Sequence, residues 1–264
     1  MIHFDQVHMK YKKGKAGTEA LRGVSFTIRA GEFVFVIGPS GSGKSTILKL
    51  MTREVIPTSG AAYMDGFCIS SMSRALVPTL RRQIGIVFQD FRLIESKTVF
   101  ENVAFAGEII GMPQKQLLRM VNIVLGVVGI GDKAASFPNE LSGGEQQRVA
   151  IARAMINEPE IIIADEPTGN LDPATSEAIM ALLEEINRNG TTVVVCTHDS
   201  NLVDRMKKRV IEVADGYVVR DAQEGAYESP SALKSEEDDD TVSEHDIIYT
   251  QQDEKQTVKK EVQV

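Results

Sequence analysis

The sequence predicts an α/β fold with a mostly parallel sheet, and three observations lead to this prediction. Short apolar runs occur at 32–37, 160–164 and 192–196, and such runs suit parallel strands that are covered on both faces. Apolar residues at helical spacing appear at 44–53 and 174–188. A glycine-rich loop joins the first run directly to its helix. We therefore expect strand and helix to alternate along the chain.

Length and charge limit the classes of function. The chain has 264 residues, of which 42% are apolar, which is enough for one large domain with a core. Residues 1–221 carry as many basic as acidic side chains, so the net charge of −8 belongs entirely to residues 222–264. This distribution offers no broad basic surface, so neither nucleic acid nor an anionic lipid surface is expected as a general partner.

No leader and no membrane span are predicted. The first residues lack a basic start followed by an apolar stretch, so no processing is expected. The longest apolar stretches, such as 123–130, are far shorter than the roughly 18 to 20 residues that cross a bilayer. Cys68 and Cys196 are too few for a disulfide framework or a metal cluster, and we expect reduced thiols in a cytoplasmic protein. A membrane role would require another chain that supplies the span.

The middle of the chain is predicted to be a helical insertion. Strand signals fade from about residue 91 to 157, and helical spacing dominates between breaks at glycine and proline. We interpret 91–157 as a helical subdomain inserted into an α/β core formed by 1–90 and 158–222. Residues 1–222 then form one domain.

The end of the chain is predicted to be a disordered tail. From 223 to 264 the apolar periodicity is lost, and the acidic run 235–240 appears. Such a segment cannot bury enough apolar surface to offset the entropy lost on ordering. We expect no packed structure there.

The first functional motif is a phosphate-binding loop. The spacing G-x-x-x-x-G-K-S begins at Gly38, and it follows an apolar run and opens a helix, as this motif requires. Its amides and the positive helix end suit phosphate oxygens, Lys44 adds a full charge, and Ser45 is placed to bind Mg²⁺. The alternative is a glycine turn before a helix. The predicted nucleotide-binding residues are Gly38, Pro39, Ser40, Gly41, Ser42, Gly43, Lys44, Ser45 and Thr46.

Two carboxylates end the second apolar run. Asp165 is suited to hold Mg²⁺ through water, and Glu166 is suited to orient or deprotonate an attacking water molecule. In the alternative interpretation, Glu166 is a solvated loop acid before Pro167. The expected chemistry is slow phosphoryl transfer to water, which depends on positioning and charge stabilisation.

A second motif, Leu-Ser-Gly-Gly-Glu-Gln-Gln-Arg at 141–148, allows two interpretations. Ser142 and Glu145 have the spacing of a capping box at a helix start. The pair Gly143 and Gly144 is not needed for capping and favours the close approach of a phosphate to bare amides. The motif can therefore start a helix, bind phosphate, or do both.

Together these motifs resemble the nucleotide-binding subunits of ABC transporters. The resemblance covers residues 1 to about 220, and the combination of motifs is highly specific. It implies a RecA-like core with N-terminal antiparallel strands, an inserted helical subdomain, ATP and Mg²⁺ as cofactors, and hydrolysis of ATP by a homodimer that closes on ATP. The matching motifs, in family order, are 38–46, Gln89, 141–148, 161–166, 170–172 and His198.

The same resemblance implies further residue roles, each with an alternative. Tyr11 would stack on adenine, or be a core aromatic residue. Gln89 would sense Mg²⁺ and the γ-phosphate, or be a polar residue at a strand end. His198 would contact the γ-phosphate and join Glu166 and Lys44 in catalysis, or cap a strand. The family also implies contacts across the dimer for Ser142, Gly143, Gly144, Gln147 and Asp172. Asp172 has an alternative role, because its spacing is that of an N-cap before Pro173.

Within this family the stretches 80–93, 98–105 and 219–227 resemble the FtsE family of cell-division ATPases, of a Gram-positive and actinobacterial type. The resemblance implies an integral membrane partner of the FtsX type that docks near Gln89 and the helical subdomain. It also implies a peripheral location on the cytoplasmic face of the membrane at the division site, where closure of the dimer regulates cell-wall hydrolysis. The alternative is the ATPase of a lipoprotein-release or macrolide-export transporter. The chain departs from shorter members of the FtsE family in its tail and in the loop 12–18.

Overall fold

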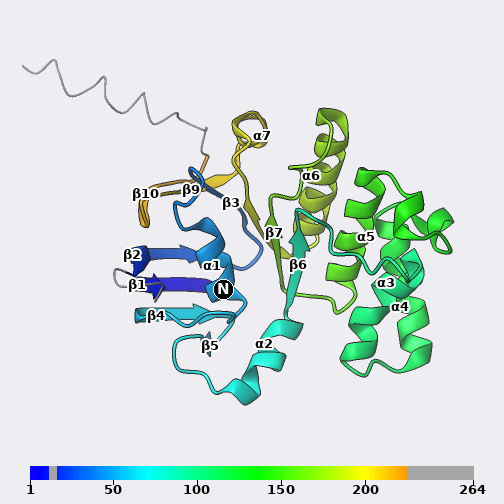
Figure 1. Cartoon of the computed structure of the whole chain (residues 1–264), viewed down its shortest axis with the longest axis horizontal. Helices are drawn as coiled ribbons and strands as arrows, with labels where there is room; N and C mark the ends of the chain where they lie inside the picture. The colour runs from blue at the N-terminus through cyan, green and yellow to red at the C-terminus, as the bar shows by residue number, and fades with distance from the viewer. Residues whose placement is uncertain (12–16, 225–264) are drawn as a thin grey trace, which may run out of the picture. The chain divides into compact units, whose positions relative to one another are not determined.

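The computed structural model describes residues 1–11 and 17–224, which form two sheets and their covering helices (Figure 1). The predicted tail therefore lies outside the described residues from 225 onward, as does most of the loop 12–18. The helices are α1 (Lys44–Met51), α2 (Val77–Arg82), α3 (Val99–Ile109), α4 (Gln114–Val127), α5 (Gly143–Met155), α6 (Pro173–Arg188) and α7 (Ser200–Met206). Short 3₁₀ turns occur at 74–76, 131–133 and 138–140.

The larger sheet confirms the predicted parallel core. Strand β3 pairs in parallel with β8 and β9, and β7 pairs in parallel with β6 and β8. Only the edge pair of β9 and β10 within this sheet is antiparallel among the described strands. The order across the sheet is β10 (Tyr217–Ala222), β9 (Arg209–Ala214), β3 (Phe33–Ile37), β8 (Thr192–Cys196), β7 (Ile161–Asp165) and β6 (Ile84–Phe88).

The smaller sheet is antiparallel and contains the N-terminal strands, as the family resemblance predicted. Its central strand β1 pairs with β2 on one side and β4 on the other. The order is β2 (Thr18–Ile28), β1 (Ile2–Tyr11), β4 (Ser59–Met64) and β5 (Phe67–Cys68). Helix α1 lies between this sheet and one face of the larger sheet, so the phosphate-binding loop is held between two layers (Figure 1).

Two hydrophobic cores cover the two faces of the larger sheet. Alternation along β3 shows the division, because Val34 packs toward α1 and the smaller sheet while Phe35 packs toward the helices on the other face. Helices α3, α4 and α5 follow β6 and precede β7 in the chain and share the second core. The inserted helical subdomain is therefore present, and its limits at 91 and 157 stay a prediction.

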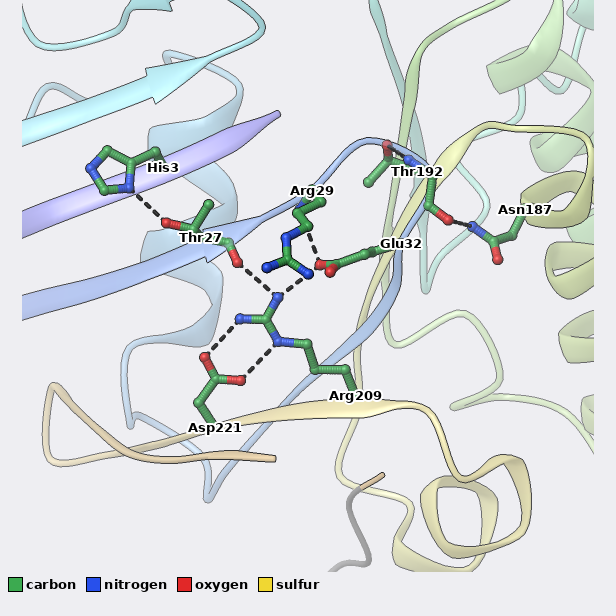
Figure 2. A network of polar contacts seen from close by, with 9 residues as sticks. His3, Thr27, Arg29, Glu32, Asn187, Thr192, Arg209 and Asp221 are labelled. Atoms are coloured by element: carbon green, nitrogen blue, oxygen red, sulfur yellow. Dashed lines mark hydrogen bonds and ion pairs between the residues drawn. The ribbon is translucent and has the colours of Figure 1, made fainter. Parts of the chain in front are cut away.

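Arg209 of β9 connects the two sheets (Figure 2). Its guanidinium donates to the carbonyl of Thr27 in β2 at 2.7 Å, to Glu32 at 2.7 Å and to both carboxylate oxygens of Asp221 at 2.7 and 2.8 Å. These bonds raise the pKa of Arg209, with Asp221 the largest cause. A largely buried arginine thus fixes the last strand against the layers that hold the nucleotide loop.

Within the described ranges, no helix combines the length and the apolar character needed to cross a membrane. Cys68 and Cys196 are free thiols, as predicted. Burial raises the pKa of the Cys196 thiol well above its usual value.

Candidate nucleotide-binding and catalytic site

The loop after β3 has the shape that the phosphate-binding motif requires. Gly38 has a φ of 142°, and a Cβ atom there would lie 2.0 Å from the carbonyl oxygen of Val213, so only glycine fits. Lys44, in the first turn of α1, donates from Nζ to the carbonyls of Gly38 at 2.6 Å and Pro39 at 3.0 Å. The hydroxyl of Ser42 is buried and has no hydrogen-bond partner among the described residues. The loop therefore offers a cationic ammonium and an unused buried donor to a ligand.

Ser45 and Asp165 line one pocket of about 100 Å³. A hydroxyl and a carboxylate are the hard oxygen donors that Mg²⁺ prefers, so the pocket fits the predicted metal. Burial and the charge of Glu166 raise the pKa of Asp165, while Lys44 opposes this shift. Within the described residues, no cluster of three or more His, Cys, Asp or Glu side chains could hold a metal. Any metal here would depend on Ser45, Asp165 and oxygen atoms from a nucleotide or water.

Gln89 directly follows Phe88, which lines that pocket and pairs with Asp165 across the sheet. Its side chain packs against Gly169, where a Cβ atom would come within 2.8 Å of Gln89 Nε2. Its backbone carbonyl accepts a hydrogen bond from Asn170 Nδ2 at 3.1 Å. The structure thus joins Gln89 to the segment after Glu166, and its roles toward Mg²⁺ and the γ-phosphate stay predictions.

The catalytic candidates Glu166 and His198 form a direct pair. His198 Nδ1 lies 2.8 Å from Glu166 Oε1. Parallel pairing places Asp165 of β7 opposite Cys196 of β8, and the amide of Glu166 donates to the carbonyl of Cys196 at 2.9 Å, so both side chains leave the same sheet edge. Glu166 itself adopts a left-handed backbone, with a φ of 48°. Strained backbone of this kind clusters at functional sites because the surrounding structure must hold it.

The motif at 141–148 starts helix α5 with a complete capping box. The amide of Glu145 donates to Ser142 Oγ at 3.3 Å, and Glu145 Oε2 accepts from the amide of Ser142 at 2.8 Å. These hydrogen bonds from Ser142 lower the pKa of Glu145. The capping interpretation is therefore confirmed, and the phosphate interpretation stays open beside it.

Gly144 has a reason to be glycine within one subunit. A Cβ atom at this position would lie 2.4 Å from the Cγ2 methyl of Thr175 in α6, and one at Gly143 would lie 3.1 Å from Leu171. Close packing of α6 thus explains Gly144 without any ligand. Gly144 is therefore no independent sign of a phosphate, and the approach of a phosphate to Gly143 and Gly144 stays a prediction.

The remaining predicted residues have different surroundings. Asp172 is the N-cap of α6 and accepts from the amide of Thr175 at 3.0 Å, so the alternative role is confirmed. Tyr11 packs against the core, and its hydroxyl lies 3.4 Å from Thr46 Oγ1. Gln147 is fully buried in α5. Within this single subunit the side chain does not reach the surface, and its role across the dimer stays a prediction.

Sequence reasoning missed two arginines beside the site. Arg92 lines the pocket of Ser45 and Asp165, and Arg153 of α5 donates to the carbonyls of residues 91 and 92. Neither belongs to a motif that marks chemistry. Their positions depend on how a loop meets a helix about 60 residues away, which no local pattern reports.

Comparisons with known proteins agree with this geometry. The model of the family described as ABC transporter matches residues 21–169. The cell division ATP-binding protein FtsE of Bacillus subtilis (strain 168) is 51% identical over 229 residues, covering 87% of this chain and 99% of the relative. The FtsE of Mycobacterium tuberculosis (strain ATCC 25618 / H37Rv) is 53% identical over 227 residues, covering 86% and 98%. The chain belongs to the FtsE family of ABC proteins.

A solved structure shares the fold of this FtsE family member. The dimeric, post-hydrolysis state of the ATP-binding cassette MJ0796 with bound ADP and Pi superposes with a TM-score of 0.76 and is 39% identical. The match covers 86% of this chain and all of that one.

Proposed function

We propose that this chain is an ATPase of cell division that binds ATP with Mg²⁺, hydrolyses it to ADP and phosphate, and acts with a membrane partner. The pair of Glu166 and His198 carries the proposal, because it lies at the sheet edge that also presents Asp165 and the phosphate-binding loop. Membership in the FtsE family supports the division role.

Each group of the chain has a separable part in hydrolysis. Lys44 and the loop amides hold the phosphates, and Ser45 and Asp165 would hold Mg²⁺, which when bound neutralises charge on the phosphate oxygens. Glu166 orients a water molecule and takes its proton on a carboxylate oxygen. His198 bonds to Glu166 Oε1, which fixes the carboxylate plane and leaves the other oxygen for the water. Tyr11 is proposed to pack on adenine, and Gln89 to respond to the metal and the γ-phosphate.

Two copies of the chain are proposed to share two sites. Each chain has one phosphate-binding loop and one motif at 141–148, so a two-fold pair closes with two equivalent sites. The dimeric state of the MJ0796 cassette with ADP and Pi supports this arrangement. The residues proposed to reach across are Ser142, Gly143, Gly144 and Asp172.

The change Glu166→Gln tests the proposal. The variant keeps the loop and the metal pocket but cannot accept the proton, so we expect it to bind ATP, to accumulate as a dimer and to hydrolyse ATP at least about 100-fold more slowly. Light scattering after size exclusion measures the dimer, and phosphate release measures turnover. Glu185→Gln on the exposed face of α6 is the matched control and should behave as wild type. Normal turnover by Glu166→Gln would remove this residue from the mechanism.

A groove between α2 and α3 supports the membrane partner. Its volume is about 530 Å³, and its apolar floor includes Ile109, which is 69% exposed. The basic side chains Arg74, Arg81 and Arg82 line it. We propose that an amphipathic cytoplasmic helix with acidic residues, from a partner of the FtsX type, occupies this groove. This contact would hold the chain at the inner face of the membrane at the division site.

The narrower origin of the chain is also a proposal. The actinobacterial type rests on the stretches at 80–93, 98–105 and 219–227. Identities of 53% to the Mycobacterium tuberculosis relative and 51% to the Bacillus subtilis relative support membership of the family equally.

A further inference from the structure

Arg92 places a cation at the proposed magnesium pocket, although no catalytic motif includes it. Its side chain lines the pocket of about 100 Å³ that also contains Ser45 and Asp165. The guanidinium lies 3.7 Å from the centre of the Phe88 ring and pairs with Asp90 at 3.1 Å. The aromatic face and the carboxylate both favour a positive charge at this place.

The backbone that carries Arg92 is held in an unusual conformation. Phe91 and Arg92 both have left-handed φ angles, of 55° and 50°. Non-glycine residues rarely adopt this region, so a second contact must stabilise the pair. Arg153 of α5 supplies that contact, since its two terminal nitrogens donate to the carbonyls of Phe91 at 2.7 Å and Arg92 at 2.5 Å.

Arg153 holds this loop at an electrostatic cost. Within the described part of the chain, it forms no ion pair with a carboxylate. Burial and the charge of Arg92 lower the pKa of Arg153. Arg153 thus binds the backbone of a second arginine, so two cationic residues are neighbours here.

Asp165 lies in the same pocket as this cation. Its carboxylate comes directly before that of Glu166 in the chain, and Arg92 and Lys49 line the pocket together with it. Positive side chains beside a carboxylate favour its charged form. A divalent cation in the same small pocket would be repelled by the guanidinium of Arg92, because both are positively charged.

We propose that Arg92 is a positioning residue that serves as the resident counter-cation of Asp165 and competes with Mg²⁺ for this pocket. The inference rests on the proposed metal role of Ser45 and Asp165. The consequence is an order of binding. Binding of the metal without nucleotide is disfavoured by the charge of the guanidinium. The negative phosphates of ATP offset this charge, so the metal binds together with the nucleotide. Because Arg92 follows Gln89 by three residues, its displacement also shifts the loop that carries Gln89.

Titration of the nucleotide-free full chain with Mn²⁺ tests the proposal, with the free ion followed by electron paramagnetic resonance. Arg92→Gln should bind Mn²⁺ about threefold to tenfold more tightly at low salt, as expected for a removed charge near a divalent ion. The gain should shrink at about 0.5 M salt, where exposed charges are screened. Arg92→Lys keeps the charge and should stay near wild type. The Arg92 side chain is 58% exposed, so these variants should fold, which thermal melting checks.

Two further variants make the result decisive. Arg119→Gln removes an equal charge from the exposed face of α4 and should leave Mn²⁺ binding unchanged. In an Asp165→Asn background, Arg92→Gln should no longer increase the affinity for Mn²⁺, because Arg92 and the metal would compete for the carboxylate of Asp165. An unchanged affinity in Arg92→Gln, an equal gain in Arg119→Gln, or a gain that persists with Asp165→Asn would each overturn the inference. If Asp165→Asn alone binds Mn²⁺ as wild type does, the proposed metal site itself fails, and the inference fails with it.

Discussion

At the scale of single residues, the local backbone sets the positions of Lys44 and Glu166 in the site. Lys44 reaches the phosphate-binding loop from the first turn of α1 and bonds two of its carbonyls. Glu166 meets His198 because its own backbone turns through a left-handed conformation at the end of β7. The left-handed backbone of Glu166 costs free energy, and such strain clusters at functional sites.

Lys44→Ala should lose ATP affinity. A charge close to the phosphates is worth up to about 4 kcal/mol at an effective dielectric of 20, which corresponds to a loss of as much as about 1,000-fold. Titration with a fluorescent ATP analogue measures the affinity. Lys115→Ala, which removes an exposed ammonium from α4, is the control and should bind as wild type does. Equal affinities for wild type and Lys44→Ala would exclude the proposed role.

At the scale of elements, two helices begin with the same device. Helix α3 starts with Thr98 and Glu101 in a capping box, and α5 starts with Ser142 and Glu145 in another. The geometry alone therefore does not mark a nucleotide site. What distinguishes α5 is its position, since its first turn packs directly on the start of α6 through Gly144.

The matched caps allow the two roles of Ser142 to be separated. Ser142→Ala and Thr98→Ala should each cost about 1 kcal/mol of stability, as lost N-caps typically do, and lower Tm by about 2–4 °C. If Ser142 also binds phosphate across the dimer, only Ser142→Ala should weaken the ATP-dependent dimer in the Glu166→Gln background. Calorimetry and light scattering measure the two effects. If the two variants dimerise equally well, Ser142 acts only as the N-cap of α5.

On the scale of the whole molecule, the inserted helices create a surface that the core lacks. The groove between α2 and α3 combines an apolar floor with three arginines. The groove lies between α2, which precedes β6 in the chain, and α3, which follows it. This arrangement suits a chain whose described residues contain no membrane-spanning helix and which would act through a partner.

Ile109→Asp should separate the chain from its membrane partner. A carboxylate on the groove floor loses apolar contact and repels the acidic helix that we propose there, so co-purification with a co-expressed membrane protein of the FtsX family should fall at least about tenfold. ATP binding should be unchanged. Ile123→Asp on α4, where the side chain is also exposed, is the control. Retention of the partner by Ile109→Asp would place the contact elsewhere.

The sequence by itself determined the layers and the chemistry. The runs around Val34 and Val194 are apolar throughout because both faces of their sheet are buried, and this local signal predicts each strand to within about one residue. The loop from Gly38 to Lys44 and the carboxylates after β7 could be predicted for a similar reason. Phosphate binding and metal binding require particular residue types at short, regular spacings.

Only the tertiary structure decided how distant segments share space. Gln147 is polar and sits in a functional motif, yet the packing of α5 encloses it completely. Gly144 faces Thr175, and Arg153 bonds the carbonyl of Arg92 from a helix about 60 residues away. These contacts are set by the three-dimensional approach of elements. A local pattern records which face of one element is apolar, and it does not record which neighbour comes to lie against that face.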